Sequence, residues 1–143
     1  MTALLDINLL LALAWPNHVH HEKAQEWFSG FGQPWATCPA TQFGFIRVSS
    51  NKKAIPEAKS PGEAQSLLQQ ITGHVHHVFW PDDLQPGSLD WLNWHYVAGH
   101  RQVSDLHLLG LAVRHSGRLA TLDRSIRRGL EANSQAHNHL LEL

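Results

Sequence analysis

The chain has 143 residues, of which 43% are hydrophobic and 16% are charged, and its formal net charge is −1. This length and composition predict one folded domain over residues 1–143 and exclude a disordered protein. The single cysteine, Cys38, excludes an intramolecular disulfide and is typical of a reducing compartment, so we expect a cytoplasmic protein. The first apolar run, residues 7–15, is far shorter than the ~20 residues that cross a membrane, so no membrane association is expected.

The first half of the chain alternates short apolar runs with longer amphipathic segments. The predicted elements are strands at residues 3–5 and 35–38 and helices at residues 7–14, 18–28, 39–50 and 60–73. Asn17 is a favourable N-cap for the second of these helices. The stretch Ser60-Pro61-Gly62-Glu63 combines a capping box with proline at the first helical position, which makes it the clearest helix start in the chain.

The second half continues the same alternation. The predicted elements are strands at residues 76–80, 119–122 and 139–143, and helices at residues 89–97, from Val103 or Ser104 to about 115, and from Arg124 onward. Residues 99–102 are predicted to be a loop, and the last strand is predicted to lie at an edge of the sheet. Strands that alternate with helices predict an α/β fold with a mostly parallel sheet and helices on both faces.

Three aspartates are expected to meet at one edge of this sheet. Asp6 and Asp123 follow two predicted strands, and Asp105 falls in the first turn of a predicted helix, where the helix dipole favours an anion. Ligands of parallel sheets bind at the carboxyl ends of the strands, near the point where the strand order reverses. A group of carboxylates there would suit Mg²⁺ or Mn²⁺, which prefer oxygen ligands. The alternative is that each aspartate is a separate helix cap facing solvent.

Three stretches of the sequence resemble PIN-domain ribonucleases, in particular the toxins of bacterial VapBC toxin–antitoxin pairs. They are LLDINLLLAL, TCPATQFGFIRVSS and GHRQVSDLHLLGLAVRHSGRLATLD, and together they span almost the whole chain in order. The resemblance implies a five-stranded parallel sheet and Mg²⁺- or Mn²⁺-dependent cleavage of RNA. It also implies a homodimer that a small cognate VapB-like antitoxin neutralises.

The resemblance also implies roles for individual residues. Asp6 and Asp105 correspond to direct metal ligands, and Asp123 to a third acid that acts partly through water. Polar residues beside these ligands would orient them; they are Asn8, Ser104 and Thr121.

Gln42 departs from the family pattern, because many members carry a glutamate at the corresponding position of the helix after the second strand. We expect Gln42 to face the metal and to supply a hydrogen bond without a charge. One alternative is therefore a PIN-like module that binds RNA or protein but catalyses weakly.

Basic residues concentrate towards the end of the chain and are candidates for contacts with RNA phosphates: Arg101, Arg124, Arg127 and Arg128. Charge alone is equally consistent with a solvated helix face.

Histidines form two further clusters, one at residues 18–21 and the other at residues 74–77. Each contains three histidines, so a site for a transition metal is a second alternative. The helical and strand periods do not bring all three onto one face in either cluster, which favours surface histidines.

Overall fold

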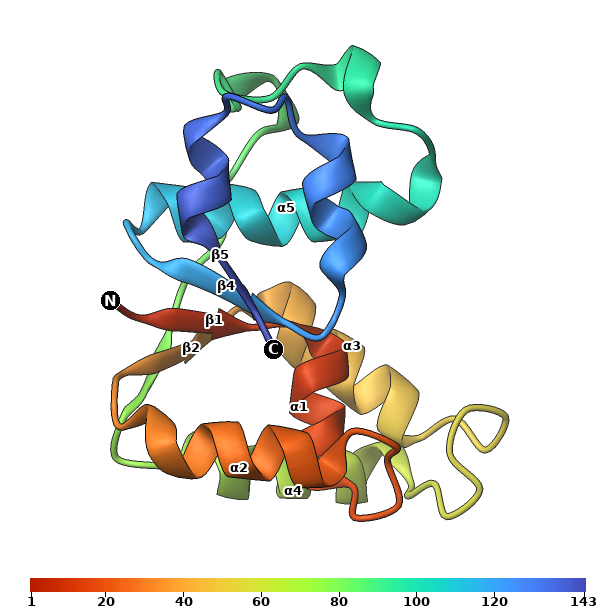
Figure 1. Cartoon of the computed structure of the whole chain (residues 1–143). Helices are drawn as coiled ribbons and strands as arrows, with labels where there is room; N and C mark the ends of the chain where they lie inside the picture. Colours follow the sequence, from red (N-terminus) through yellow and green to blue (C-terminus); the bar gives the residue numbers. More distant parts are fainter.

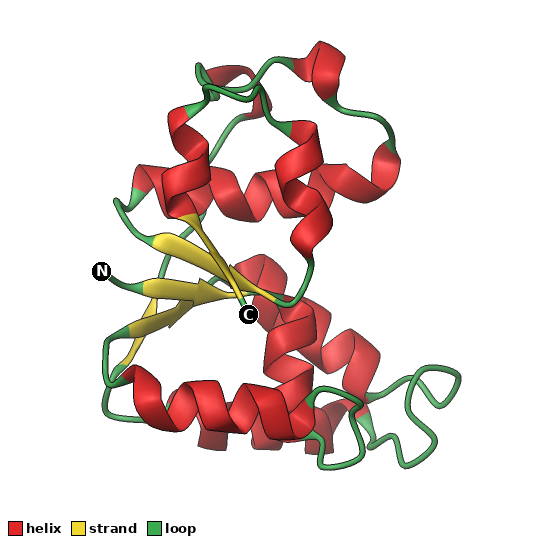
Figure 2. Cartoon of the chain, in the orientation of Figure 1, coloured by secondary structure: helices red, strands yellow, loops and turns green.

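A sheet of five short parallel strands forms the centre of the molecule, and the computed structural model describes all 143 residues (Figures 1 and 2). The strands are β1 (Ala3–Leu5), β2 (Trp35–Thr37), β3 (His77–Phe79), β4 (Arg118–Thr121) and β5 (Leu140–Glu142). Their order in the sheet is β3-β2-β1-β4-β5, and every neighbouring pair is parallel. The predicted α/β fold with about five strands is confirmed, including the edge position of the last strand.

Helices cover both faces of the sheet because side chains alternate between the two faces along each strand. The helices are α1 (Ile7–Ala14), α2 (His21–Phe31), α3 (Pro39–Ser49), α4 (Pro61–Thr72) and α5 (His100–Arg114). Leu4 and Leu119 pack in a buried cluster with residues of α5, whereas Leu5 and Ala120 pack in a second cluster with α1, α3 and α4. Figure 1 shows α5 above the sheet and α2 and α4 below it.

The order in which strands are added to the sheet reverses at β1, although all strands remain parallel. From β1 the sheet grows through β2 to β3 on one side, and the later strands β4 and β5 then add on the other side of β1. A parallel sheet opens a crevice at the carboxyl ends of its strands at such a reversal. Leu5 lies opposite Ala120 in the β1–β4 pair, so the residues directly after these two strands face this crevice together.

Helix α5 begins earlier than predicted, which changes the place of Asp105. The predicted loop at residues 99–102 is wrong, because α5 starts at His100 with Gly99 as its N-cap. Gln102, the third residue of the helix, accepts a hydrogen bond from the backbone N–H of Ala98 at 2.8 Å and so satisfies a donor at the helix start. Asp105 consequently lies in the second turn of α5, and the prediction that it sits in a first turn is wrong.

The predicted start of α2 and the predicted helix at residues 89–97 also differ from the structure. The N-cap of α2 is His20, and Asn17 lies outside the helix, where its carboxamide donates to Glu57 at 3.4 Å. The predicted helix at residues 89–97 is wrong, because the segment is mostly irregular, with a turn at residues 90–91 and one short 3₁₀ segment, η2 (Trp94–Tyr96). The side chain of Asn93 accepts a bond from the N–H of His95, which favours a turn over a helix.

None of the helices is long and apolar enough to cross a membrane.

Candidate active site

Asp6 stands directly after β1, buried at 6% exposure, and begins α1 as its N-cap. Its backbone N–H donates to the carbonyl of Ala120 at 3.1 Å, so the residue is held at the end of the β1–β4 pair. One carboxylate oxygen, Oδ1, accepts the N–H of Leu9 at 2.7 Å, and the other, Oδ2, accepts the hydroxyl of Thr121 at 2.5 Å. Asp6 is therefore an N-cap, and capping occupies only part of its carboxylate, which leaves lone pairs for a further ligand.

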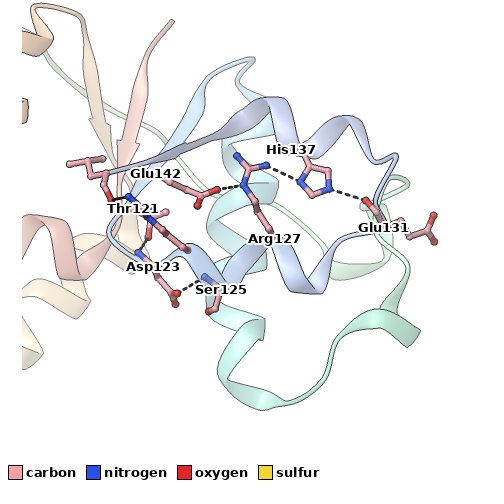
Figure 3. A network of polar contacts seen from close by, with 9 residues as sticks. Thr121, Asp123, Ser125, Arg127, Glu131, His137 and Glu142 are labelled. Atoms are coloured by element: carbon pink, nitrogen blue, oxygen red, sulfur yellow. Dashed lines mark hydrogen bonds and ion pairs between the residues drawn. The ribbon is translucent and has the colours of Figure 1, made fainter.

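Thr121 connects two of the three aspartates. Its side chain is fully buried at the end of β4. The hydroxyl donates to Asp6 and accepts the backbone N–H of Asp123 at 3.0 Å, and Asp123 in turn accepts the N–H of Ser125 at 2.8 Å (Figure 3). This chain of bonds fixes the loop after β4 against the end of β1, as expected for a residue that orients the acids.

Asp105 approaches the same place from α5, on the helical layer above the sheet. Burial, together with smaller contributions from the nearby charges of Asp123 and Asp6, raises the pKa of its carboxyl group to about 6. Burial is also the main reason that the pKa of Asp6 is raised, with a smaller contribution from Asp123, while the bonds from Thr121 and Leu9 oppose the shift. The structure thus brings together all three predicted acids from β1, β4 and α5.

The charges of this group are not compensated within the chain. The ion pairs of the structure are His107–Asp82, Arg114–Asp83 and Arg127–Glu142, and none includes Asp6, Asp105 or Asp123. Buried or half-buried carboxylates without a cationic partner are costly, and a divalent cation would relieve that cost.

The donor set fits Mg²⁺ or Mn²⁺ held loosely, and does not fit a closed metal cage. No three His, Cys, Asp or Glu side chains stand close enough to share one metal ion directly. Mg²⁺ needs no such cage, because it keeps several waters and commonly binds through one or two carboxylates plus substrate phosphates. Asp6 and Asp105 would be the carboxylates for this mode of binding.

Three other predicted site residues are placed differently. The carboxamide of Asn8 is exposed and bonds His18 at 3.1 Å, while Ser104 is exposed beside Asp105 on α5. The amide of Gln42 donates to Thr37 Oγ1 at 2.9 Å, and this hydroxyl also contacts a ring nitrogen of His77 at 2.7 Å. The structure therefore joins Gln42 to β2 and β3, and no bond joins it to an acid.

The predicted RNA-binding arginines divide into two kinds. Arg127 lies in the 3₁₀ segment η3 (Arg124–Gly129), pairs with Glu142 of β5 and donates to the ring of His137 (Figure 3), so its guanidinium is already used within the fold. Arg124 bonds the carbonyl of Leu143 at 3.4 Å. Arg101 and Arg128 are exposed without an ion pair.

The histidine clusters do not form metal sites. In the first cluster, His18 bonds Asn8 and His21 bonds the carbonyl of Ala12 at 2.7 Å, so the rings turn to different partners. In the second, His74 packs beside Trp35, and His77 bonds Thr37. Neither cluster provides three convergent ligands.

The sequence interpretation missed the face that α3 turns towards α5. Residues 40, 43, 44 and 47 follow the helical period and line a groove with Ser104, His107 and Leu108 of α5. The spacing of these four residues is visible in the sequence, but Gln42, the residue chosen as a site candidate, lies on the neighbouring face of α3 and contacts Thr37.

Comparison with known proteins places the chain among named relatives. No family model matches it. Ribonuclease VapC39 of Mycobacterium tuberculosis is 45% identical over 132 residues, which are 88% of this chain and 91% of the relative. Ribonuclease VapC38 of the same species is 43% identical, covering 87% of this chain and 86% of the relative, and Ribonuclease VapC29 is 37% identical, covering 88% and 89%. Similarity of this extent, on a five-stranded parallel fold, shows that the chain belongs to the VapC family of PIN-domain ribonuclease toxins.

Proposed function

We propose that this chain is a Mg²⁺- or Mn²⁺-dependent endoribonuclease and acts as the toxin of a toxin–antitoxin pair. The observation that carries the proposal is the convergence of Asp6, Asp105 and Asp123, which share a negative potential with no cationic partner in the chain. The names of the relatives supply the reaction class, since each is a ribonuclease. The proposed partners are an RNA substrate, a cognate VapB-like antitoxin and a second copy of the chain.

Each residue of the site has a distinct task in this proposal. Asp6 and Asp105 hold the cation, and Asp123 bonds water beside it. The hydroxyl of Thr121 fixes the rotamer of Asp6, because it donates to Oδ2 and leaves the remaining lone pairs free. When bound, the cation would neutralise charge developing on the phosphodiester and lower the pKa of an attacking water.

The position of the site also suits a polyanion. Asp6 is almost fully buried while Asp123 is exposed, so the acids run from the interior to the surface. A phosphate approaching from solvent would complete the coordination that the carboxylates leave open. Without a cation the same carboxylates would repel the scissile phosphate, so cleavage is expected to need the metal, whereas nucleotides bound outside the acidic group are not expected to depend on it.

The test is cleavage of total RNA by the purified chain, with the new ends mapped by sequencing. Cleavage with Mg²⁺ or Mn²⁺ that stops in EDTA, and that Asp6→Asn abolishes, supports the proposal. Asp90→Asn is the matched control, because Asp90 is exposed and distant in the chain from the site. Binding of Mn²⁺ is followed separately as an increase in melting temperature, which Asp6→Asn should remove. Cleavage that survives Asp6→Asn, or that needs no metal, overturns the proposal.

A further inference from the structure

A groove of about 410 Å³ runs between α3 and α5, and two of its lining residues are next in sequence to two of the three acids. It is lined by Ile7, Ala40, Phe43, Gly44, Arg47, Ser104, His107 and Leu108. Ile7 follows Asp6 in the chain and Ser104 precedes Asp105, so the backbone of two of the three acids borders the groove. Its volume is in the range of sites for small molecules, and it has room for one nucleotide.

The ring of Phe43 is the exceptional feature of this groove. It is 76% exposed, although a phenylalanine normally gains about 1.5–3 kcal/mol from burial. A planar, solvated aromatic side chain next to a candidate phosphodiester site is what a nucleobase stacks on in proteins that bind single-stranded nucleic acid.

The guanidinium of Arg47 supplies the complementary charge. It lies one helical turn after Phe43 on the same side of α3, is exposed, and takes part in none of the ion pairs of the structure. Nothing within the chain therefore competes with a phosphate for this side chain. Across the groove, Asp82 contacts Nε2 of His107 at 2.5 Å and holds that ring as part of the opposite wall.

We propose that this groove is the binding site for one nucleotide of a single-stranded RNA substrate, next to the scissile phosphodiester. The base stacks on Phe43 and its phosphate pairs with Arg47, which positions the neighbouring phosphodiester over the acids. The proposal rests on the proposed ribonuclease function for the identity of the ligand. Because stacking is tolerant of base identity, the groove selects single strands over duplexes and not one particular base.

The test measures binding apart from cleavage, with a fluorescein-labelled uridine octamer in EDTA and fluorescence anisotropy as the readout. Phe43→Ala should weaken binding about 5- to 100-fold, the loss typical for one stacked base, while Phe43→Trp should preserve it. Arg47→Ala should reduce the slope of log affinity against log salt by about 0.7. The matched controls are Phe79→Ala, which removes another exposed ring on the edge strand β3, and Arg118→Ala, which removes a cation at the opposite, amino end of β4.

The outcomes separate this proposal from the proposed function. Weaker binding by both groove variants, with unchanged controls and circular dichroism, supports the groove even if no RNA is cleaved. Binding that Phe43→Ala leaves unchanged overturns it, whether or not the wild-type chain is a nuclease. Sedimentation velocity examines the competing occupant, a second copy of the chain: a dimer that Phe43→Ala converts to monomer, with RNA binding unchanged, would also refute the proposal.

Discussion

Replacing Asp105 with asparagine is expected to stabilise the metal-free protein at neutral pH, although it removes a proposed metal ligand. Burial and the charges of Asp123 and Asp6 raise the pKa of Asp105 from 3.8 to about 6. The folded state therefore binds more protons than the unfolded state between about pH 4 and pH 6, and stability falls as the pH rises through this window. Above it, the ionised carboxylate destabilises the fold, and asparagine does not.

The magnitude follows from the two pKa values. At about 1.4 kcal/mol for each pKa unit, the change from 3.8 to about 6 corresponds to at most about 3 kcal/mol. Asp105 is only half-buried, and solvent screening reduces the expected effect to about 1 kcal/mol. For a chain of this size, that corresponds to an increase of about 3 °C in melting temperature.

The assay is thermal unfolding followed by circular dichroism, from pH 4 to pH 8, in EDTA and then in Mn²⁺. In EDTA, Asp105→Asn should melt above wild type at pH 7.5 and together with it near pH 4. In Mn²⁺ at pH 7.5 the order should reverse, because only wild type binds the cation well, and saturation a hundredfold above Kd contributes about 2.7 kcal/mol. Asp90→Asn should match wild type under both conditions. A variant that is less stable than wild type in EDTA at pH 7.5 would refute the reasoning, because Asp105 would then be making a favourable contact.

Three further substitutions examine the surroundings of the site. Gly117→Ala should destabilise the fold by about 1–3 kcal/mol in urea, because a Cβ there would stand 2.5 Å from the carbonyl oxygen of Thr2. Thr121→Val should reduce the free energy of unfolding by a similar amount, because it leaves buried polar groups without partners. The hydroxyl of Thr121 lowers the pKa of Asp6, so its removal should raise that pKa and move Mn²⁺ binding to higher pH. Gln42→Glu should leave the Mn²⁺ titration of melting temperature unchanged, because Gln42 is joined to Thr37; tighter Mn²⁺ binding would show that the side chain reaches the acids.

Much of the fold could be predicted from the sequence because local signals and the sheet agree. The capping box at Ser60 begins α4 at Pro61, and the short apolar runs became strands in every predicted place. The start of α5 could not be predicted in this way. Gly99 is typical of a loop, and the helix begins directly after it, where Gln102 accepts the backbone N–H of Ala98 across the cap.

The proximity of Asp6 and Asp123 could be predicted from the sequence, whereas the orientation of the side chains of Asn8 and Gln42 could not. Asp6 and Asp123 follow strands, so the topology of a parallel sheet brings them together whatever their rotamers. Asn8 and Gln42 lie in helices, where a rotation of one residue changes the face. The helical period places Ala40, Phe43 and Arg47 towards α5, whereas Gln42 turns to the hydroxyl of Thr37.

The bond between Asp6 and Thr121 joins residues 115 positions apart, and it has a consequence for the order of events during translation. Strand β1 is synthesised well before its neighbour β4 and the loop bearing Asp123, because β2, β3 and all five α-helices lie between them in the chain. A nascent chain consequently cannot assemble its acidic site before β4 and the loop after it have been synthesised, and the proposed nuclease is inert until that point. A chain truncated after Gly117 is accordingly expected to show no Mn²⁺-dependent stabilisation, and a truncated chain that does show it would contradict this order of assembly.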